Sequence, residues 1–407
     1  MYREFKEKLL GGGKIISTFV VENIFCMIDS ISIKNYKSIL DLTVELGRVN
    51  VFIGANGVGK SNILEAVAMC AASRGGHVEI KDLLSKGVRV ARPELTLSSF
   101  YGRKLENIVS MILAFSGNRK MEYAISCKDV ENIYSTWENK ITYSPEEGDW
   151  KSRVTSMAKD KALEEILKVA SVEKDFQGER EFITRFLIYS LSTNALRGIS
   201  QDSVETPLGI YGEGLDVLIN NLTEEESEKL KEIAHQGIAW MEDIFCDKDD
   251  LYKIGGYKLG RSVSRLYFRD RYMQKKNSFF SAENVNEGAL YLLFYLTLFI
   301  STRTPSFFAI DNIETGLNPR LCRFLMKQIA MLASDHQKQV LITTHNPAIL
   351  DGLNLNDDNQ RLFVVARKDD GQTRVERLRL KPETEGKQFM LSELWQRGFI
   401  GGLPDNF

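Results

Sequence analysis

An eight-residue stretch that ends in a lysine and a serine carries the clearest chemical signal in this sequence. Residues 54–61 read Gly-Ala-Asn-Gly-Val-Gly-Lys-Ser and fit the pattern G-x-x-x-x-G-K-[ST]. In this pattern the backbone N–H groups surround the phosphates of a nucleotide, the lysine contacts the β- and γ-phosphates, and the hydroxyl binds Mg²⁺. We therefore predict a nucleoside triphosphate site whose contacts are Asn56, Gly57, Val58, Gly59, Lys60, Ser61 and Asn62.

The residues on either side of this loop can position it. Residues 48–53 are short and apolar, which is typical of a buried parallel strand. After the loop, apolar residues recur at helical spacing from Ile63 to Ala71, so a helix should begin near Lys60 and direct its free N–H groups at an anion. The alternative is a glycine-rich turn that binds nothing, and the complete motif between a strand and a helix disfavours it.

Two more apolar segments end in residues that could complete the site. Residues 306–311 form an expected strand that ends at Asp311, a carboxylate that can hold Mg²⁺ together with Ser61. Residues 340–344 form another, followed by His345, which at the end of a core strand is placed to contact a γ-phosphate. A lone histidine more often has a structural role, so this assignment depends on where the strand lies in the sheet.

Length and composition indicate a soluble globular protein. The 407 residues suffice for one large composite domain or two ordinary ones, and the chain is 43% hydrophobic and 27% charged. A net charge of −2 gives no overall reason to expect DNA binding, and five scattered cysteines suggest neither a disulfide framework nor a zinc site. No segment is apolar enough to span a bilayer, so we expect a cytoplasmic protein without membrane contact. Residues 1–26 read as an N-terminal tail or an extra strand.

Hydrophobic periodicity places further elements along the chain. Strand patterns occupy residues 28–33, 42–46, 95–97 and 108–113. Helical spacing occurs in residues 151–170, 179–196 and 224–244. No heptad pattern is sustained, so we expect no long coiled-coil arm.

Residues 253–276 form a basic segment that is interleaved with aromatic residues. Its eight lysines and arginines face a single acid, Asp270. The segment could bind the backbone of a nucleic acid, DNA or RNA. It could also be a strand pair with solvated long side chains, or a face for an acidic partner protein. A charge run of this kind is more often a solvated face.

Four segments together resemble ABC-type, AAA-family ATPases of the RecF/SMC/OLD branch, such as the ATPase subunits of phage-defence systems. They are residues 33–39, the phosphate loop, residues 307–319 and residues 343–347. The resemblance covers most of residues 27–407 and implies ATP as the nucleotide. It implies an α/β fold, an ABC-type P-loop ATPase head whose mixed sheet is flanked by helices. The core would comprise residues 27–127 and 253–407, with an inserted, mostly helical lobe at residues 128–252.

The resemblance also implies a second copy of the chain. In this family a signature segment opens a helix shortly before the acidic strand and contacts the γ-phosphate held by the other subunit. Here that segment is residues 285–289, in which Asn286 is a good N-cap and Gly288 lets backbone N–H groups approach an anion. A head-to-tail homodimer would then hold ATP at its interface, in contact with Asn286 and Gly288.

The sequence departs from the family at residues that matter for turnover. Asn286 stands where a serine is usual, and Asn312 stands where the family places the glutamate that acts as general base. An amide cannot accept a proton from the attacking water, so we expect slow ATP hydrolysis. Glu314 matches a second acidic position of the family and could assist, as could His345. The glutamine that senses Mg²⁺ is missing from its usual place, because no glutamine precedes Gln177.

Three functions fit these features. The first is an ATP-binding and ATP-hydrolysing dimer that controls a separate effector chain, such as a nuclease, in a bacterial defence or DNA-maintenance complex. No nuclease domain fits after residue 399, so we expect the effector on another chain. The alternative is a RecF-like DNA-repair ATPase that binds DNA directly through residues 253–276. A transporter nucleotide-binding subunit ranks last, because the signature segment diverges and the glutamine is missing.

Overall fold

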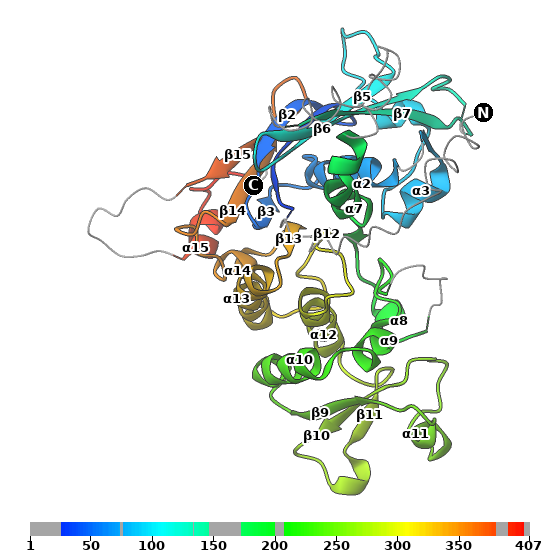
Figure 1. The fold of residues 1–407 in the computed structure, drawn as a ribbon. Helices are drawn as coiled ribbons and strands as arrows, with labels where there is room; N and C mark the ends of the chain where they lie inside the picture. The colour runs from blue at the N-terminus through cyan, green and yellow to red at the C-terminus, as the bar shows by residue number, and fades with distance from the viewer. Residues whose placement is uncertain are drawn as a thin grey trace, which may run out of the picture.

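The computed structural model describes residues 26–73, 76–132, 134–145, 172–199, 207–379 and 390–402. Residues 1–25 of the predicted N-terminal tail and the predicted helix at 151–170 lie outside these ranges. The described chain is built in layers: a sheet, a helix, a second sheet, a layer of helices and a small third sheet (Figure 1).

The central sheet has the strand order β15-β14-β3-β13-β12-β8. Its strands are β3 (Val49–Ile53), β8 (Ile188–Tyr189), β12 (Phe307–Ile310), β13 (Gln339–Thr343), β14 (Gln360–Arg367) and β15 (Thr373–Leu378). All neighbours run parallel except β14 and β15. Every residue of β3, β12 and β13 is buried, because helices or a second sheet cover both faces. The carboxyl ends of these three strands therefore meet at one edge.

An antiparallel sheet with the order β2-β1-β5-β6-β7-β4 covers one side of the molecule. Its strands are β1 (Ile28–Tyr36), β2 (Ile39–Glu45), β4 (His77–Val78), β5 (Ile108–Phe115), β6 (Arg119–Cys127) and β7 (Trp137–Ser144). Helix α2 (Lys60–Ala72) lies between the two sheets and is buried along nearly its whole length. One hydrophobic cluster joins this sheet, α2 and one face of the central sheet, including Phe52. Val51 and Ile53, on the other face, belong to a second cluster.

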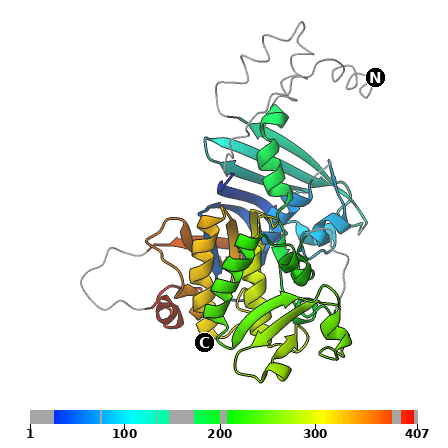
Figure 2. The same ribbon diagram turned by 60° about the horizontal axis from the view of Figure 1, so that its bottom comes forward.

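Helices cover the second face of the central sheet. The long ones are α10 (Glu224–Gly237), α12 (Glu287–Ile300) and α13 (Pro319–Asp335), which lie side by side (Figure 2). Short helices complete the described chain: α3 (Ile80–Ser85), α4 (Pro93–Thr96), α7 (Gln177–Thr184), α8 (Thr193–Leu196), α9 (Leu215–Asn220), α14 (Pro347–Leu350) and α15 (Leu391–Gln396).

A third, three-stranded antiparallel sheet lies beyond the helices, at the end of the molecule away from β1 and β2. It consists of β9 (Met241–Cys246), β10 (Leu266–Asp270) and β11 (Phe279–Ser281). The short helix α11 (Leu251–Ile254) and a 3-10 turn at Lys275–Asn277 lie in its connections. We call residues 241–281 the distal lobe.

Three predicted elements are wrong in part. The helix predicted at 179–196 breaks, because β8 joins the central sheet beside β12. The helix predicted at 224–244 ends at Gly237, and β9 begins four residues later. Residues 95–97 belong largely to α4 rather than to a strand. Short apolar runs bury equally well in a strand or a helix, so periodicity alone could not separate them. The described residues of 128–252 consequently include the strands β7, β8 and β9 beside their helices.

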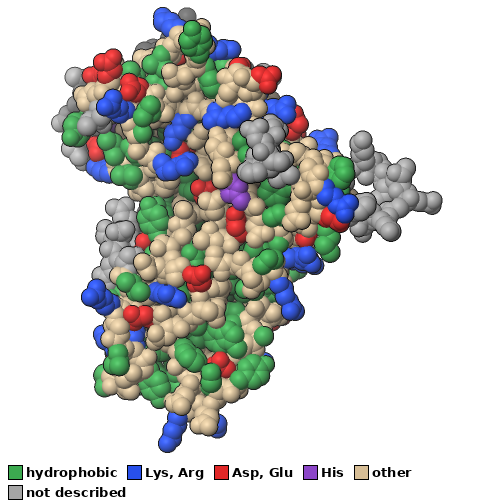
Figure 3. Space-filling view, turned by 180° about the vertical axis from the view of Figure 1, so that it is seen from behind, with side chains coloured by type: hydrophobic (Ala, Val, Ile, Leu, Met, Phe, Trp, Pro, Cys, Tyr) green, Lys and Arg blue, Asp and Glu red, His purple; other side chains and the backbone are tan. Residues whose placement is uncertain are grey.

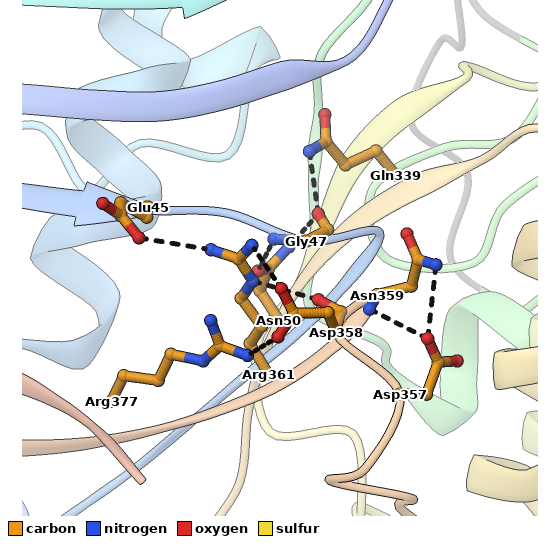
Figure 4. Close-up of polar contacts among 9 residues, drawn as sticks. All are labelled: Glu45, Gly47, Asn50, Gln339, Asp357, Asp358, Asn359, Arg361 and Arg377. Carbon is orange, nitrogen blue, oxygen red and sulfur yellow. Dashed lines mark hydrogen bonds and ion pairs between the residues drawn. The ribbon is translucent and has the colours of Figure 1, made fainter. Parts of the chain in front are cut away.

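A polar network fixes the turn between β2 and β3, at the edge of the central sheet opposite the phosphate loop (Figure 4). The Asn50 side chain, fully buried, accepts from the Gly47 N–H at 2.8 Å and donates to the Gly47 carbonyl at 2.8 Å. The Gln339 amide donates to the same carbonyl at 2.8 Å. Arg361 lies 3.8 Å from Asp358 on the surface beside it. Because the buried amides of Asn50 and Gln339 are paired with the Gly47 backbone, this turn can set the position from which β3 starts.

Candidate nucleotide-binding site

The phosphate loop lies between β3 and α2, at the carboxyl edge of the central sheet. Gly57 and Gly59 adopt φ angles of 77° and 107°, in the region that glycine enters without strain. Helix α2 begins at Lys60, as predicted. The loop borders a cavity of about 350 Å³ that Asn56, Gly57, Gly59, Lys60, Ser61 and Asn62 line together with residues from other segments. The sequence therefore identified most of this wall, although Val58 turns inward and is buried.

Lys60 lies at the base of the cavity with little exposure to solvent. Its Nζ donates to the carbonyl oxygens of Gly54 and Ala55, both at 2.9 Å. Burial lowers the pKa of Lys60 to about 8, although Asp311 and Glu314 act in the opposite direction. A bound phosphate would offer Nζ a charged acceptor and raise this pKa again.

Ser61 and Asp311 meet across the cavity as predicted for a metal site. The Ser61 hydroxyl donates to both carboxylate oxygens of Asp311 at 3.2 Å. The Thr343 hydroxyl, at the end of β13, donates to one of them at 2.5 Å and holds the carboxylate in place. These hard oxygen donors suit Mg²⁺. Thr343 was not predicted as a site residue, although its position at the end of the strand beside β12 was a usable signal.

Asn312 lines the cavity directly, whereas Glu314 is held to one side. Asn312 has a φ of 55°, a left-handed conformation that asparagine tolerates better than most residues. Glu314 accepts one hydrogen bond from the Thr344 hydroxyl and one from the His345 N–H, both at 2.8 Å. Among the described residues that line the cavity, Glu314 is absent. Through these two hydrogen bonds Glu314 holds the backbone at Thr344 and His345 in place.

His345 also lines the cavity, at the end of β13. Burial and the neighbouring Lys60 lower the pKa of its imidazole below the usual value of 6.5. The ring is therefore neutral at pH 7. It can donate a hydrogen bond from its ring N–H to a phosphate oxygen but adds no positive charge.

Two side chains from distant segments, Thr373 and Ser38, hold the phosphate loop together with the neighbouring Asn62, and sequence patterns did not identify the three as a group. The Thr373 hydroxyl donates to the Val58 carbonyl at 2.7 Å and lies 2.7 Å from the Ser38 hydroxyl. The Asn62 amide donates to Ser38 at 2.7 Å. A Cβ on Gly59 would lie 2.3 Å from the Thr373 hydroxyl oxygen, so a glycine is needed here. Thr373 has no recognisable motif around it, which is why it escaped prediction.

Two arginines reach the site from outside the motifs. Arg89 lines the cavity and pairs through Nε with Glu65 at 2.5 Å. Glu65 is buried and also pairs with Lys37. Arg367 donates from its guanidinium to the Gly57 carbonyl at 2.9 Å. No pattern in the sequence marked either arginine.

The structure does not bring the signature segment to this cavity within the described chain. Asn286 caps α12 as predicted, since its Oδ1 accepts from the Ala289 N–H at 3.0 Å. Asn286 and Glu287 are exposed, and Gly288 is partly exposed. The start of α12 therefore faces solvent, while the remainder of the helix is buried in the core.

Comparisons with known proteins place these features in context. Residues 27–84 match the family described as AAA ATPase domain. Residues 259–351 match the family described as AAA domain, putative AbiEii toxin, Type IV TA system. Neither match reaches half of the chain.

Curated relatives align over short stretches. The uncharacterized protein MJECL10 of Methanocaldococcus jannaschii is 36% identical over 80 residues, which are 19% of this chain and 33% of that protein. The DNA replication and repair protein RecF of Clostridium botulinum is 28% identical over 124 residues, 30% of this chain and 33% of that protein. The aligned parts thus span about a third of each relative.

A solved structure shares the fold. The crystal structure of an SMC head bound to the C-winged helix domain of ScpA superposes with a TM-score of 0.54 and 14% identity. The match covers 87% of this chain and 98% of that one. It confirms the α/β head with mixed sheets flanked by helices. Across the described ranges, none of the helices combines the length and apolarity that a bilayer crossing requires.

Proposed function

We propose that this chain, an ABC-type ATPase of the RecF/SMC kind, binds ATP with Mg²⁺ at the carboxyl edge of its central sheet and hydrolyses it slowly. The observation that carries the proposal is the convergence of Lys60, Ser61 and Asp311 on one cavity from two separate strand ends. The loop N–H groups and Lys60 would hold the phosphates. Ser61 and Asp311 would hold Mg²⁺, which would neutralise charge on the β- and γ-phosphates.

Slow turnover follows from the groups that could handle the attacking water. Asn312 borders the cavity but its amide can only orient water, since it has no proton-accepting carboxylate. Glu314 is occupied by two hydrogen bonds and acts by positioning His345. His345, neutral at pH 7, would contact the γ-phosphate.

We further propose a head-to-tail homodimer. The exposed start of α12, with Asn286 and Gly288, would supply the N–H groups that complete the triphosphate site of a second copy. The closed dimer would control a separate effector chain in a cytoplasmic defence or DNA-maintenance complex. The AbiEii-type family match and the partner-bound SMC head support this assignment by analogy.

A RecF-like ATPase that binds DNA directly is the second candidate. The aligned RecF segment favours it. Salt-dependent DNA affinity that is lost when Arg265, Arg269 and Arg271 are neutralised would support this candidate over an effector-controlling subunit.

The test of the nucleotide site is ATP binding by the Lys60→Ala variant. Isothermal titration calorimetry with MgATP should show binding to the wild type and a loss of about 100-fold or more in the variant, because a charge-assisted phosphate contact disappears. Lys34→Ala is the matched control, since Lys34 is exposed and, in the described part of the chain, pairs with Asp41 of the antiparallel sheet. Equal ATP affinity in wild type and Lys60→Ala would refute the site.

A further inference from the structure

The distal lobe exposes aliphatic side chains that its own fold leaves uncovered. Leu251 and Ile254 lie three residues apart on one side of α11 and are 65% and 80% exposed. Leu259 is 90% exposed and Met273 is 52% exposed. Figure 3 shows hydrophobic side chains gathered over this end of the molecule, with lysine or arginine at its extremity. We call Leu251, Ile254, Leu259 and Met273 the apolar tip.

Most aromatic residues of the same segment pack against one another, although Tyr272 is 75% exposed. Tyr252, Tyr257 and Phe279 contact one another in tilted or edge-to-face arrangements, with ring centroids 5.0–5.9 Å apart. Tyr267 is buried against Phe245 in the same cluster. These rings pack into one cluster in the lobe and do not form a row of free faces on which successive bases could stack.

Three of the four arginines in residues 253–276 also make contacts within the lobe, whereas the fourth, Arg261, is exposed. Arg265 lies 3.4 Å from Asp250, and Arg269 lies over the ring of Phe279. Arg271 donates to the Met241 carbonyl at 2.7 Å. Arg265, Arg269 and Arg271 therefore each have a contact inside the fold.

Lysines remain beside the apolar tip. Lys253, Lys275 and Lys276 are exposed, and among the described residues no acid lies within ion-pair distance of them. The Tyr257 hydroxyl donates to the Lys276 carbonyl at 3.4 Å, which connects the α11 side of the lobe to the Lys275 turn. Uncovered aliphatic residues bordered by unpaired cations thus occupy the end of the lobe.

We propose that the distal lobe is the docking surface for a partner protein whose contact face has an apolar centre and an acidic rim. Desolvated aliphatic anchors with charged residues around them are the composition of protein–protein interfaces. Aliphatic side chains contribute little to a phosphate backbone, so a nucleic acid would leave the apolar tip unused. The inference rests on the effector partner of the proposed function, although it requires no ATP hydrolysis.

The test is photo-crosslinking in the host cell of the full-length protein. A benzoylphenylalanine replaces Leu259, and the matched control replaces Leu95, which is 60% exposed on α4 at the other end of the molecule. We expect one partner protein to be crosslinked from position 259 and not from position 95, through a peptide rich in Asp and Glu. Charge reversal by Lys253→Glu, Lys275→Glu and Lys276→Glu together should reduce the yield about tenfold. The same three changes at Lys34, Lys104 and Lys128, which are exposed elsewhere, should not.

The other occupants give distinct results. Crosslinks to a second copy of the chain, a yield that the charge reversal does not change, or no crosslink at all would overturn the proposal. Binding of a DNA duplex or single strand that is lost in the lysine variant would assign the lobe to nucleic acid and also overturn it. Binding to phosphatidylserine vesicles that is lost in Leu259→Asp would assign the lobe to a membrane surface and would also overturn the proposal. ATP titration of each variant should be unchanged, which separates this test from that of the nucleotide site.

Discussion

The charge of Lys60 makes the nucleotide site sensitive to pH, because burial lowers its pKa to about 8 in the free protein. Below pH 8 the ammonium group is charged and ready to bind. Above pH 8 the free protein loses that proton, and ATP must restore it on binding. Since the two carbonyl contacts at 2.9 Å are weaker partners than phosphate oxygens, binding should shift the pKa upward.

The resulting prediction is a pH-dependent ATP affinity. Affinity should be constant well below pH 8 and fall by up to about tenfold for each pH unit above it, as one proton is taken up per ATP bound. Calorimetry in buffers of different ionisation enthalpy measures both the affinity and the proton uptake. Lys60→Arg, which stays charged, should bind with no such slope. A flat profile in the wild type would show that Lys60 is charged throughout.

Substitutions at Glu314 and Asn312 should change the rate of ATP turnover in opposite directions. In Glu314→Gln the amide can accept through only one oxygen, so the bond from Thr344 or from the His345 N–H is lost. Turnover should fall about tenfold while ATP affinity stays within about twofold. Asn312→Asp restores a carboxylate beside the cavity and should raise turnover. Steady-state phosphate release measures both. Unchanged turnover in Glu314→Gln would remove Glu314 from the mechanism.

At the scale of elements, the Thr373 contact on β15 connects a distant strand to the phosphate loop. Thr373→Val keeps the volume but removes the hydroxyl that lies between Val58 and Ser38. We expect ATP affinity to fall about tenfold, because a loop hydrogen bond of this kind contributes about 1 kcal/mol and its loss frees Ser38 and Asn62 as well. Thr142→Val is the control, because Thr142 is exposed on β7. Equal ATP affinity in Thr373→Val and Thr142→Val would mean that the loop is set by its backbone alone.

The elements that could be predicted are those specified by local pattern. Helix α12 is uniformly apolar after an asparagine cap, and β3 is a short apolar run before glycines, so both were found from the sequence. Strand β8 could not be predicted from the sequence, because its two residues form a strand only through pairing with β12. The residues of the site also fall into those that a local pattern predicts and those that it does not. Lys60, Ser61 and Asp311 belong to motifs, whereas Arg89 and Thr373 reach the loop through tertiary contacts alone.

At the scale of the whole molecule, the two halves of the proposed ATP site lie on different surfaces. The cavity with Lys60 opens at the edge of the central sheet, and the start of α12 faces solvent elsewhere on the described chain. One copy can therefore hold a triphosphate but cannot enclose it with Gly288. The distal lobe lies at the end of the molecule away from the antiparallel sheet (Figure 1). A partner bound there could change position when the two copies of the proposed dimer rearrange.

Complementation between two inactive variants tests the shared site most directly. Lys60→Ala removes the phosphate contact, and Gly288→Asp places a negative charge at the helix start. The added Cβ would lie 3.2 Å from the Gly316 carbonyl, a contact that a small shift can relieve. Each variant alone should have no ATPase activity. A mixed dimer would unite the intact cradle of one copy with the intact α12 start of the other, so an equal mixture should recover about a quarter of wild-type turnover. A mixture no more active than its two components would contradict a site built from two copies.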